Sequence, residues 1–188
     1  MAQPYTKNII KQVFIKQLNE MPLNKITVKS IVDECQINRN TFYYHYSDIY
    51  AVLEEIFAEE VEKGIEDYND SLSWEEAFIR SANFAFENKK AIYHIYYSMQ
   101  REQLEKYLFN TAGYVMNRYV KRINDSIGAD KEDEQVIAFF YQCAMTQIVL
   151  KWVEKGMSED ILTIIHKTQR IFDGNIEAML KRSKADTK

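Results

Sequence analysis

Glycine and proline are scarce in this chain, and their scarcity constrains the fold more than any other feature. The 188 residues include only five glycines and two prolines. A β-sandwich or β-barrel needs many turns, and turns are built largely from these two residue types. Apolar residues recur at spacings of three and four, the period of a helix with one buried face. The sequence therefore predicts an all-α fold, and its 46% hydrophobic content excludes general disorder.

Helix boundaries follow from capping residues and from the few breakers. Thr, Ser and Asn are favoured N-cap residues, and such residues precede most of the periodic apolar segments. The segment 23–26 is expected to be a short connector, and the tail from residue 181 is expected to be frayed. We predict helices at residues 6–21 (capped by Thr6), 27–35 (Thr27), 38–46 (Asn38), 47–68 (Ser47), 73–86 (Ser73), 89–97, 100–124, 132–155 and 158–180 (starting at Ser158).

The most informative segment comprises two short predicted helices, at 27–35 and 38–46, joined by a tight turn at Gln36 and Ile37. This arrangement is typical of a helix-turn-helix, with apolar residues where the helices cross and polar residues on the outer face of the second helix. The apolar positions are Val28, Ile31, Val32, Cys35, Ile37 and Phe42, and the outer positions are Arg39, Asn40, Thr41, Tyr43 and Tyr44. An alternative interpretation makes the aromatic cluster at 42–46 a clamp that holds the small domain onto its neighbour, which accounts for Phe42, Tyr46 and His45.

The segments ITVKSIV at 26–32 and INRNTFYYHY at 37–46 resemble the DNA-binding head of the TetR family of transcriptional regulators. The resemblance implies a TetR-like fold with a three-helix head at 1–46, a connecting helix at 47–70 and a larger helical effector-binding and dimerisation domain at 71–188. The segments YLFN at 107–110 and WVEKGM at 152–157 are similar to the branch that includes regulators of dihydroxyacetone-kinase operons.

By the same resemblance, the chain is expected to be a homodimer that reads a palindromic double-stranded DNA operator through the helix at 38–46. Arg39 is suited to guanine and Asn40 to adenine, and Lys7 is a further candidate for phosphate contact. The expected DNA-binding residues are Thr27, Lys29, Asn38, Arg39, Asn40, Thr41, Tyr43, Tyr44, His45 and Ser47.

The sequence departs from the family pattern in three places. One of them, the missing lysine, together with the acidic predicted helix at 47–68, favours an alternative, a TetR-shaped protein-interaction module without operator binding. Cys35 and Gln36 replace the usual Ala-Gly pair of the turn, Ile49 replaces a frequent lysine, and Asp48 would repel a nearby phosphate. Residues 1–50 carry six basic and four acidic residues, whereas the rest of the chain carries 18 basic and 24 acidic ones. The head is therefore only mildly basic, on an acidic body.

The predicted helix at 132–155 is apolar nearly all round, so both its faces must be covered. The resemblance implies that it pairs with the helix at 158–180 across a two-fold axis, as a four-helix bundle. The alternative is a helix buried at the centre of a monomer. The expected dimer residues are Tyr141, Met145, Ile148, Trp152, Ile161, Ile165 and Phe172.

Aromatic residues and methionines gather between residues 93 and 140, where family members often bind an inducer between helices. A plain aromatic core is the alternative interpretation. The effector is expected to be a small molecule or another protein. The candidate pocket residues are Tyr93, Tyr97, Phe109, Tyr114 and Phe140.

Catalytic and metal-binding motifs are missing from the sequence. It contains no GxSxG, no glycine-rich phosphate loop and no HExxH, so we expect neither an enzyme nor a cofactor. His94 and His166 have no partner at metal-ligand spacing, so no metal site is expected. Cys35 and Cys143 are interpreted as buried thiols in a reducing cytoplasm, and no apolar run has the length of a membrane span.

Overall fold

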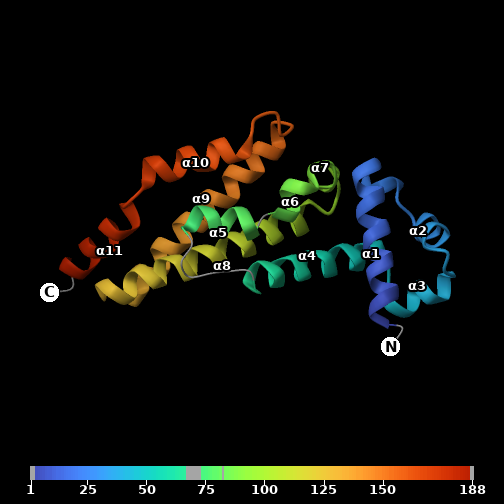
Figure 1. Ribbon diagram of the computed structural model, residues 1–188, viewed down its shortest axis with the longest axis horizontal. Coiled ribbons are helices and arrows are strands. Elements are labelled where there is room, and N and C mark those ends of the chain that lie inside the picture. Colours follow the sequence, from blue (N-terminus) through green and yellow to red (C-terminus); the bar gives the residue numbers. More distant parts are fainter. Residues whose placement is uncertain (1–2, 67–72, 82, 187–188) are drawn as a thin grey trace. The chain divides into compact units, whose positions relative to one another are not determined.

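The computed structural model describes residues 3–66, 73–81 and 83–186, and each regular element in this part of the chain is a helix. The all-α prediction is therefore confirmed (Figure 1). The helices are α1 (Gln3–Glu20), the 3-10 turn η1 (Leu23–Lys25), α2 (Val28–Cys35), α3 (Arg39–His45), α4 (Ile49–Glu66), α5 (Trp74–Ser81), α6 (Asn83–Glu87), α7 (Lys89–Tyr96), α8 (Arg101–Ile127), α9 (Lys131–Glu154), α10 (Ile161–Phe172) and α11 (Asn175–Asp186).

The chain packs as two compact units. Unit 1 contains the residues up to Glu60 together with Phe84–Leu104, and unit 2 contains Val61–Asn83 and the residues from Glu105 onward. Packing therefore groups α6 and α7 with the expected DNA-binding head, although both follow the connecting helix in sequence. The functional boundaries at residues 46 and 70 stay a prediction.

Unit 1 is built around α1, which packs against α2 and α7. Figure 1 shows α2 and α3 side by side next to α1. The side chains of Ile10 and Phe14 on α1, Phe42 on α3 and Ile92 on α7 have no exposed surface. Burial of each such side chain contributes about 1.5–3 kcal/mol, so these residues hold the short helices of the head in place.

Local hydrogen bonds explain where the helices of the head begin. Asn38 caps α3 as predicted, because its side-chain oxygen accepts a hydrogen bond from the backbone N–H of Thr41. Ser47 was the expected cap of α4, and this prediction is wrong. The carboxylate of Asp48 accepts the backbone N–H groups of Tyr50 and Ala51 instead, as favoured for an acidic group at a helix N-terminus.

The first helix begins earlier than predicted. It starts at Gln3, so Thr6 lies inside α1 and does not cap it. The proline at position 4 falls in the first turn, where its missing N–H has no helical acceptor to bond, and so it does not interrupt the helix.

Unit 2 contains a close approach between α8 and α9. The side-chain amide of Gln142 lies against Gly113, so close that a Cβ at this glycine would fall 2.4 Å from Gln142 Nε2. The same amide donates a hydrogen bond of 3.0 Å to the backbone carbonyl of Phe109. A glycine on α8 therefore allows a side chain of α9 to bond directly to the backbone of α8.

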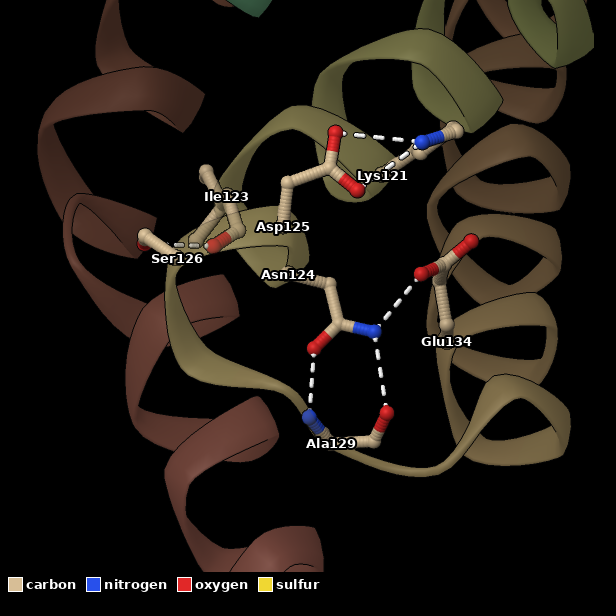
Figure 2. A network of polar contacts seen from close by, with 7 residues as sticks. All are labelled: Lys121, Ile123, Asn124, Asp125, Ser126, Ala129 and Glu134. Carbon is tan, nitrogen blue, oxygen red and sulfur yellow. Dashed lines mark hydrogen bonds and ion pairs between the residues drawn. The ribbon is translucent and has the colours of Figure 1, made fainter.

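Asn124 ties the connection between α8 and α9 together, as Figure 2 shows. Its oxygen accepts the N–H of Ala129 at 2.7 Å, and its amide donates to the carbonyl of Ala129 at 3.1 Å and to the carboxylate of Glu134 at 2.6 Å. Asn124 is 6% exposed, so its side chain is buried with its polar atoms bonded. Gly128 supplies the positive φ of +74° that the turn requires.

The end of the chain differs from its prediction. The single helix expected at 158–180 is divided into α10 and α11 by Asp173 and by Gly174, which has a φ of +74°. Asp160, and not Ser158, caps α10, because its carboxylate accepts the N–H of Leu162. The tail expected to be frayed continues as α11 to Asp186, and its Ser183 bonds to Asp133 of α9 at 2.5 Å.

Helix α9 is the one described helix whose length and composition would allow it to cross a membrane. More than half of its most apolar window is buried inside the protein, as in the core helix of a globular protein. One side of α9 remains open in the single chain, since Val136, Phe139 and Phe140 are each more than half exposed.

Candidate nucleic-acid interface

The turn between α2 and α3 has a glutamine, Gln36, at a positive φ, a backbone conformation that a glycine would adopt without strain. Gln36 has φ 56° and ψ 38°, a left-handed conformation, in the tight turn that the sequence predicted. Its N–H points to the carbonyls of Asp33 and Val32, and the N–H of Ile37 bonds to the carbonyl of Val32 at 3.0 Å. These bonds end α2 sharply and bring α3 next to it, as a helix-turn-helix requires.

The residues of α3 divide between an inner and an outer face. Phe42 is fully buried and Tyr46, which follows the helix, is 4% exposed. Tyr43 and Tyr44 are 54% and 70% exposed, and Arg39 and Asn40 are exposed as well. The clamp interpretation therefore applies to Phe42 and Tyr46, while the other side chains form a polar outer face.

Asn38 and Thr41, two of the expected contact residues, are bonded to each other at the start of α3. Asn38 accepts from the Thr41 N–H at 2.8 Å and from the Thr41 hydroxyl at 3.1 Å. His45 is half-buried, and its ring packs edge-on against Tyr44 with centroids 5.0 Å apart. Ser47 is exposed, directly before the cap of α4.

The N-terminus of α2 carries a reciprocal capping box. Thr27 Oγ1 accepts the N–H of Ser30 at 3.0 Å, and Ser30 Oγ accepts the N–H of Thr27 at 3.1 Å. Because the Thr27 oxygen acts as an acceptor here, its own hydroxyl hydrogen can be donated outward. Lys29 is exposed two residues further along the chain, so the first turn of α2 also carries a solvent-accessible lysine.

Two lysines of α1, Lys7 and Lys11, are engaged with α4. Lys7 Nζ lies 2.7 Å from Glu55, and the buried Lys11 contacts both Glu55 and Glu59. Burial by itself would raise the pKa of Glu55, but the hydrogen bond and charge of Lys7 and the charge of Lys11 outweigh it and lower that pKa. Lys7 therefore has its charge balanced within unit 1, which disfavours the phosphate contact expected for it.

Comparison with known proteins identifies the family. A TetR-type family profile described as "Transcriptional regulator C-terminal region" matches residues 73–174, more than half of the chain. The chain belongs to the TetR family of transcriptional regulators. Members of this family regulate transcription and are not enzymes. No curated protein matches the sequence.

A solved structure has a similar fold. The dihydroxyacetone kinase operon activator DhaS superimposes with a TM-score of 0.76, covering 95% of this chain and 98% of that chain. The sequences are 16% identical, so the likeness shows a shared TetR fold. The resemblance seen in the head segments is thus confirmed at the level of the family and the fold.

The effector residues expected of a TetR-family member are divided between the units. Tyr93 and Tyr97 belong to unit 1, where their rings pack with centroids 4.7 Å apart. Phe109, Tyr114 and Phe140 belong to unit 2. The effector pocket stays a prediction.

The expected dimer residues are mostly covered within one chain of this TetR-family protein. Ile148 is half-buried and Phe172 is 41% exposed. The other five are at most 6% exposed: Tyr141, Met145, Trp152, Ile161 and Ile165. A groove of about 460 Å³ runs between α9 and α10, and Phe140, Ile148 and Phe172 are among the residues that line it.

The histidine and cysteine residues considered in the sequence do not form a metal site. Among the described residues no group of His, Cys, Asp and Glu could hold a metal ion. His166 pairs with the buried carboxylate of Glu75. The prediction that both thiols are buried is wrong for Cys143, which is exposed on α9, whereas burial raises the pKa of the half-buried Cys35.

Sequence reasoning missed one residue that touches this site. Gln17 of α1 is 4% exposed, and its amide contacts both Ser30 and Glu34 of α2. A polar residue at an otherwise apolar helical position next to Leu18 was the signal that could have found it.

Proposed function

We propose that this TetR-family regulator binds a palindromic operator as a homodimer, with α3 in the major groove and its output controlled by an effector. The outer face of α3 carries the proposal. Arg39, Asn40 and Tyr44 project from a short helix that is capped by Asn38 and anchored by Phe42. An anchored helix with exposed Arg and Asn side chains has the side-chain chemistry for reading guanine and adenine in the major groove.

The backbone of the operator would be held mainly at α2. Thr27 can donate its hydroxyl hydrogen to a phosphate, and Lys29 can neutralise one. Tyr43 is exposed beside the base-reading residues and is suited to a further phosphate. The proposed interface also includes four residues in or next to α3: Asn38, Thr41, His45 and Ser47.

A second candidate function has one specific observation in its favour. Glu55 and Glu59 occupy Lys7 and Lys11, so the head offers DNA less positive charge than its six basic residues suggest. A TetR-shaped interaction module without operator binding would have no need of that charge. The exposed Arg and Asn of α3 favour the operator-binding function instead.

The proposed dimer forms through α9 and α10. Val136, Phe139 and Phe140 form an exposed apolar ridge on α9. The groove with α10 lies along this ridge, and a second groove, of about 510 Å³ and lined by Asn117, Val136 and Phe139, lies between α8 and α9. A ridge flanked by grooves can pack against its own copy about a two-fold axis.

The protein is proposed to work in the cytoplasm. Its effector is proposed to bind within residues 93–140. A small molecule or a protein that binds here would change operator affinity by about 1–3 kcal/mol, the usual size of an allosteric coupling. The similar structure is that of an operon activator, and the proposed output of this regulator is either activation or repression of transcription. A ligand screen by thermal shift with the parent, Tyr97→Ala and Phe140→Ala tests the location of the site.

Selection of duplexes from a random-sequence library, followed by titration of the selected duplex, tests operator binding. Arg39→Ala is expected to weaken binding to it by about 1–3 kcal/mol and to relax selectivity at one base position. Arg182→Ala, an exposed arginine of α11, is the matched control and should bind as the parent does. Failure of the parent to select any sequence would favour the interaction module.

Lys29→Ala provides an independent arm of the same experiment. It is expected to weaken binding to all duplexes alike and to reduce the slope of log affinity against log salt by about 0.9, the value for one phosphate contact. An unchanged slope would remove Lys29 from the proposed interface.

A further inference from the structure

The side-chain amide of Gln17 is fully engaged at the start of α2. Its Nε2 donates to the backbone carbonyl of Ser30 at 3.2 Å and to the carboxylate of Glu34 at 2.7 Å. Its Oε1 lies 2.9 Å from Ser30 Oγ, whose single hydrogen it shares with the backbone carbonyl of Thr27, 2.8 Å from the same hydroxyl oxygen. Three contacts therefore join one buried side chain of α1 to two residues that lie on successive turns of α2.

Ser30 connects this amide to the proposed phosphate contact. The same serine hydroxyl that faces Gln17 also accepts the N–H of Thr27, and the serine N–H bonds to Thr27 Oγ1. Because both halves of the capping box run through Ser30, a shift of Ser30 would reorient the Thr27 hydroxyl. Gln17 can thus determine where this hydroxyl points without approaching DNA itself.

Glu34 strengthens the attachment from the opposite side. Its carboxylate accepts hydrogen bonds from Gln17 and from the exposed Lys16, and these two bonds, in that order, lower its pKa. An ionised carboxylate makes a stronger hydrogen bond with the Gln17 amide than a neutral one. Lys16 shares the carboxylate with Gln17 but has no hydrogen bond to Ser30 among the described contacts, so Lys16 is a matched control.

We infer that Gln17 is a positioning residue of the DNA interface, which acts through Ser30 to fix the Thr27 hydroxyl for a backbone phosphate. The inference rests on the proposed operator binding. It adds a buried residue of α1 to an interface whose other members are on α2, on α3 and at their ends. A residue that served only the packing of α1 against α2 would have the same burial, so the test must separate the two roles.

A double-mutant cycle separates them. The probe is the duplex that the parent selects from the random-sequence library, titrated at a temperature where circular dichroism shows each variant folded. Gln17→Leu, which keeps the size of the side chain, is expected to weaken binding about tenfold, as for one lost hydrogen bond of good geometry. Thr27→Val is expected to weaken it at least as much, and the double variant no more than Thr27→Val alone.

Ser30→Ala provides a second route if Gln17→Leu does not fold. It should show the same loss and the same lack of additivity with Thr27→Val, whereas Lys16→Met should bind as the parent does. The inference is overturned if Gln17→Leu binds as the parent does, or if its loss multiplies with that of Thr27→Val. A parent that selects no duplex would instead contradict the proposed function, so the two failures can be told apart.

Discussion

On α7, Nδ1 of His94 lies 2.6 Å from the backbone carbonyl oxygen of Leu18, in the last turn of α1. The residue four positions beyond Leu18 is Pro22, which has no N–H to donate to this carbonyl. The imidazole therefore supplies the hydrogen bond that the helix cannot. The nearby amide of Asn19 adds bonds to the Asn88 side chain and to the N–H of Ala91, so the end of α1 is fastened to α7.

Replacing His94 by Ala is expected to lower the free energy of unfolding by about 1–2 kcal/mol, because the part-buried Leu18 carbonyl loses its donor. Chemical denaturation followed by circular dichroism measures this change. Lys90→Ala, at an exposed position of the same helix, is the control and should leave stability unchanged. Equal stability of His94→Ala and the parent would mean that water replaces the imidazole.

The close approach of Gly113 and Gln142 predicts that the effect of Gly113→Ala on stability changes sign when Gln142 is removed. Alanine is a better helix former than glycine by about 0.5–1 kcal/mol, yet a methyl group at Gly113 would displace the Gln142 amide from its bond to Phe109. We expect Gly113→Ala to destabilise the protein by roughly 1 kcal/mol. In a Gln142→Ala background the same substitution should instead stabilise it. Thermal unfolding of the four proteins tests this, and the same sign in both backgrounds would contradict the packing.

The ion pairs between α1 and α4 predict acid sensitivity. The pKa of Glu55 is lowered in the folded protein, so its stabilising effect is complete above its ordinary value of 4.5 and is lost as the pH falls through the folded pKa. The difference in unfolding free energy between about pH 7 and about pH 3 should therefore be smaller in Glu55→Gln than in the parent. Glu62→Gln, at an exposed position of α4, is the control. An identical pH dependence of Glu55→Gln and the parent would rule out this contribution.

The proposed dimer predicts two different outcomes for similar substitutions. Phe140 is 56% exposed, so Phe140→Glu should give a folded monomer, while Ile165 is fully buried and Ile165→Glu should unfold the protein by burying an unpaired charge. Analytical ultracentrifugation with circular dichroism distinguishes them. Sedimentation of the parent as a monomer at micromolar concentration would contradict the proposed assembly.

Much of the helical pattern could be predicted because helix ends are determined by local chemistry. Thr27, Asn38 and Ser73 each lie within a few residues of the N–H groups that they cap, and all three caps are present in the structure. The tight turn predicted at Gln36 and Ile37 is present as well, with Gln36 in the left-handed conformation. The errors at Ser47 and Ser158 arose where an Asp stands one or two residues further on and competes for the same N–H groups.

Tertiary relationships could not be predicted in the same way. The attachment of α7 to α1 joins His94 to Leu18 across 76 positions, and nothing in the local sequence of either residue indicates the other. The apolar stripe of α9 indicated that this helix needs partners, but not that Met145 is covered within the chain while Phe140 is left open. Gln17 was overlooked because a single polar residue on a helix is ordinarily solvated.

The composition of unit 1 limits how this regulator can be recombined with others. The polypeptide leaves unit 1 after Glu60, returns at Phe84 and leaves again after Leu104. A chimaera that exchanges only the first 60 residues would separate α1 from the α7 surface to which His94 and Asn88 fasten it. Grafting a new DNA specificity onto this body therefore requires changes to the outer face of α3 alone, or transfer of residues 84–104 together with the head.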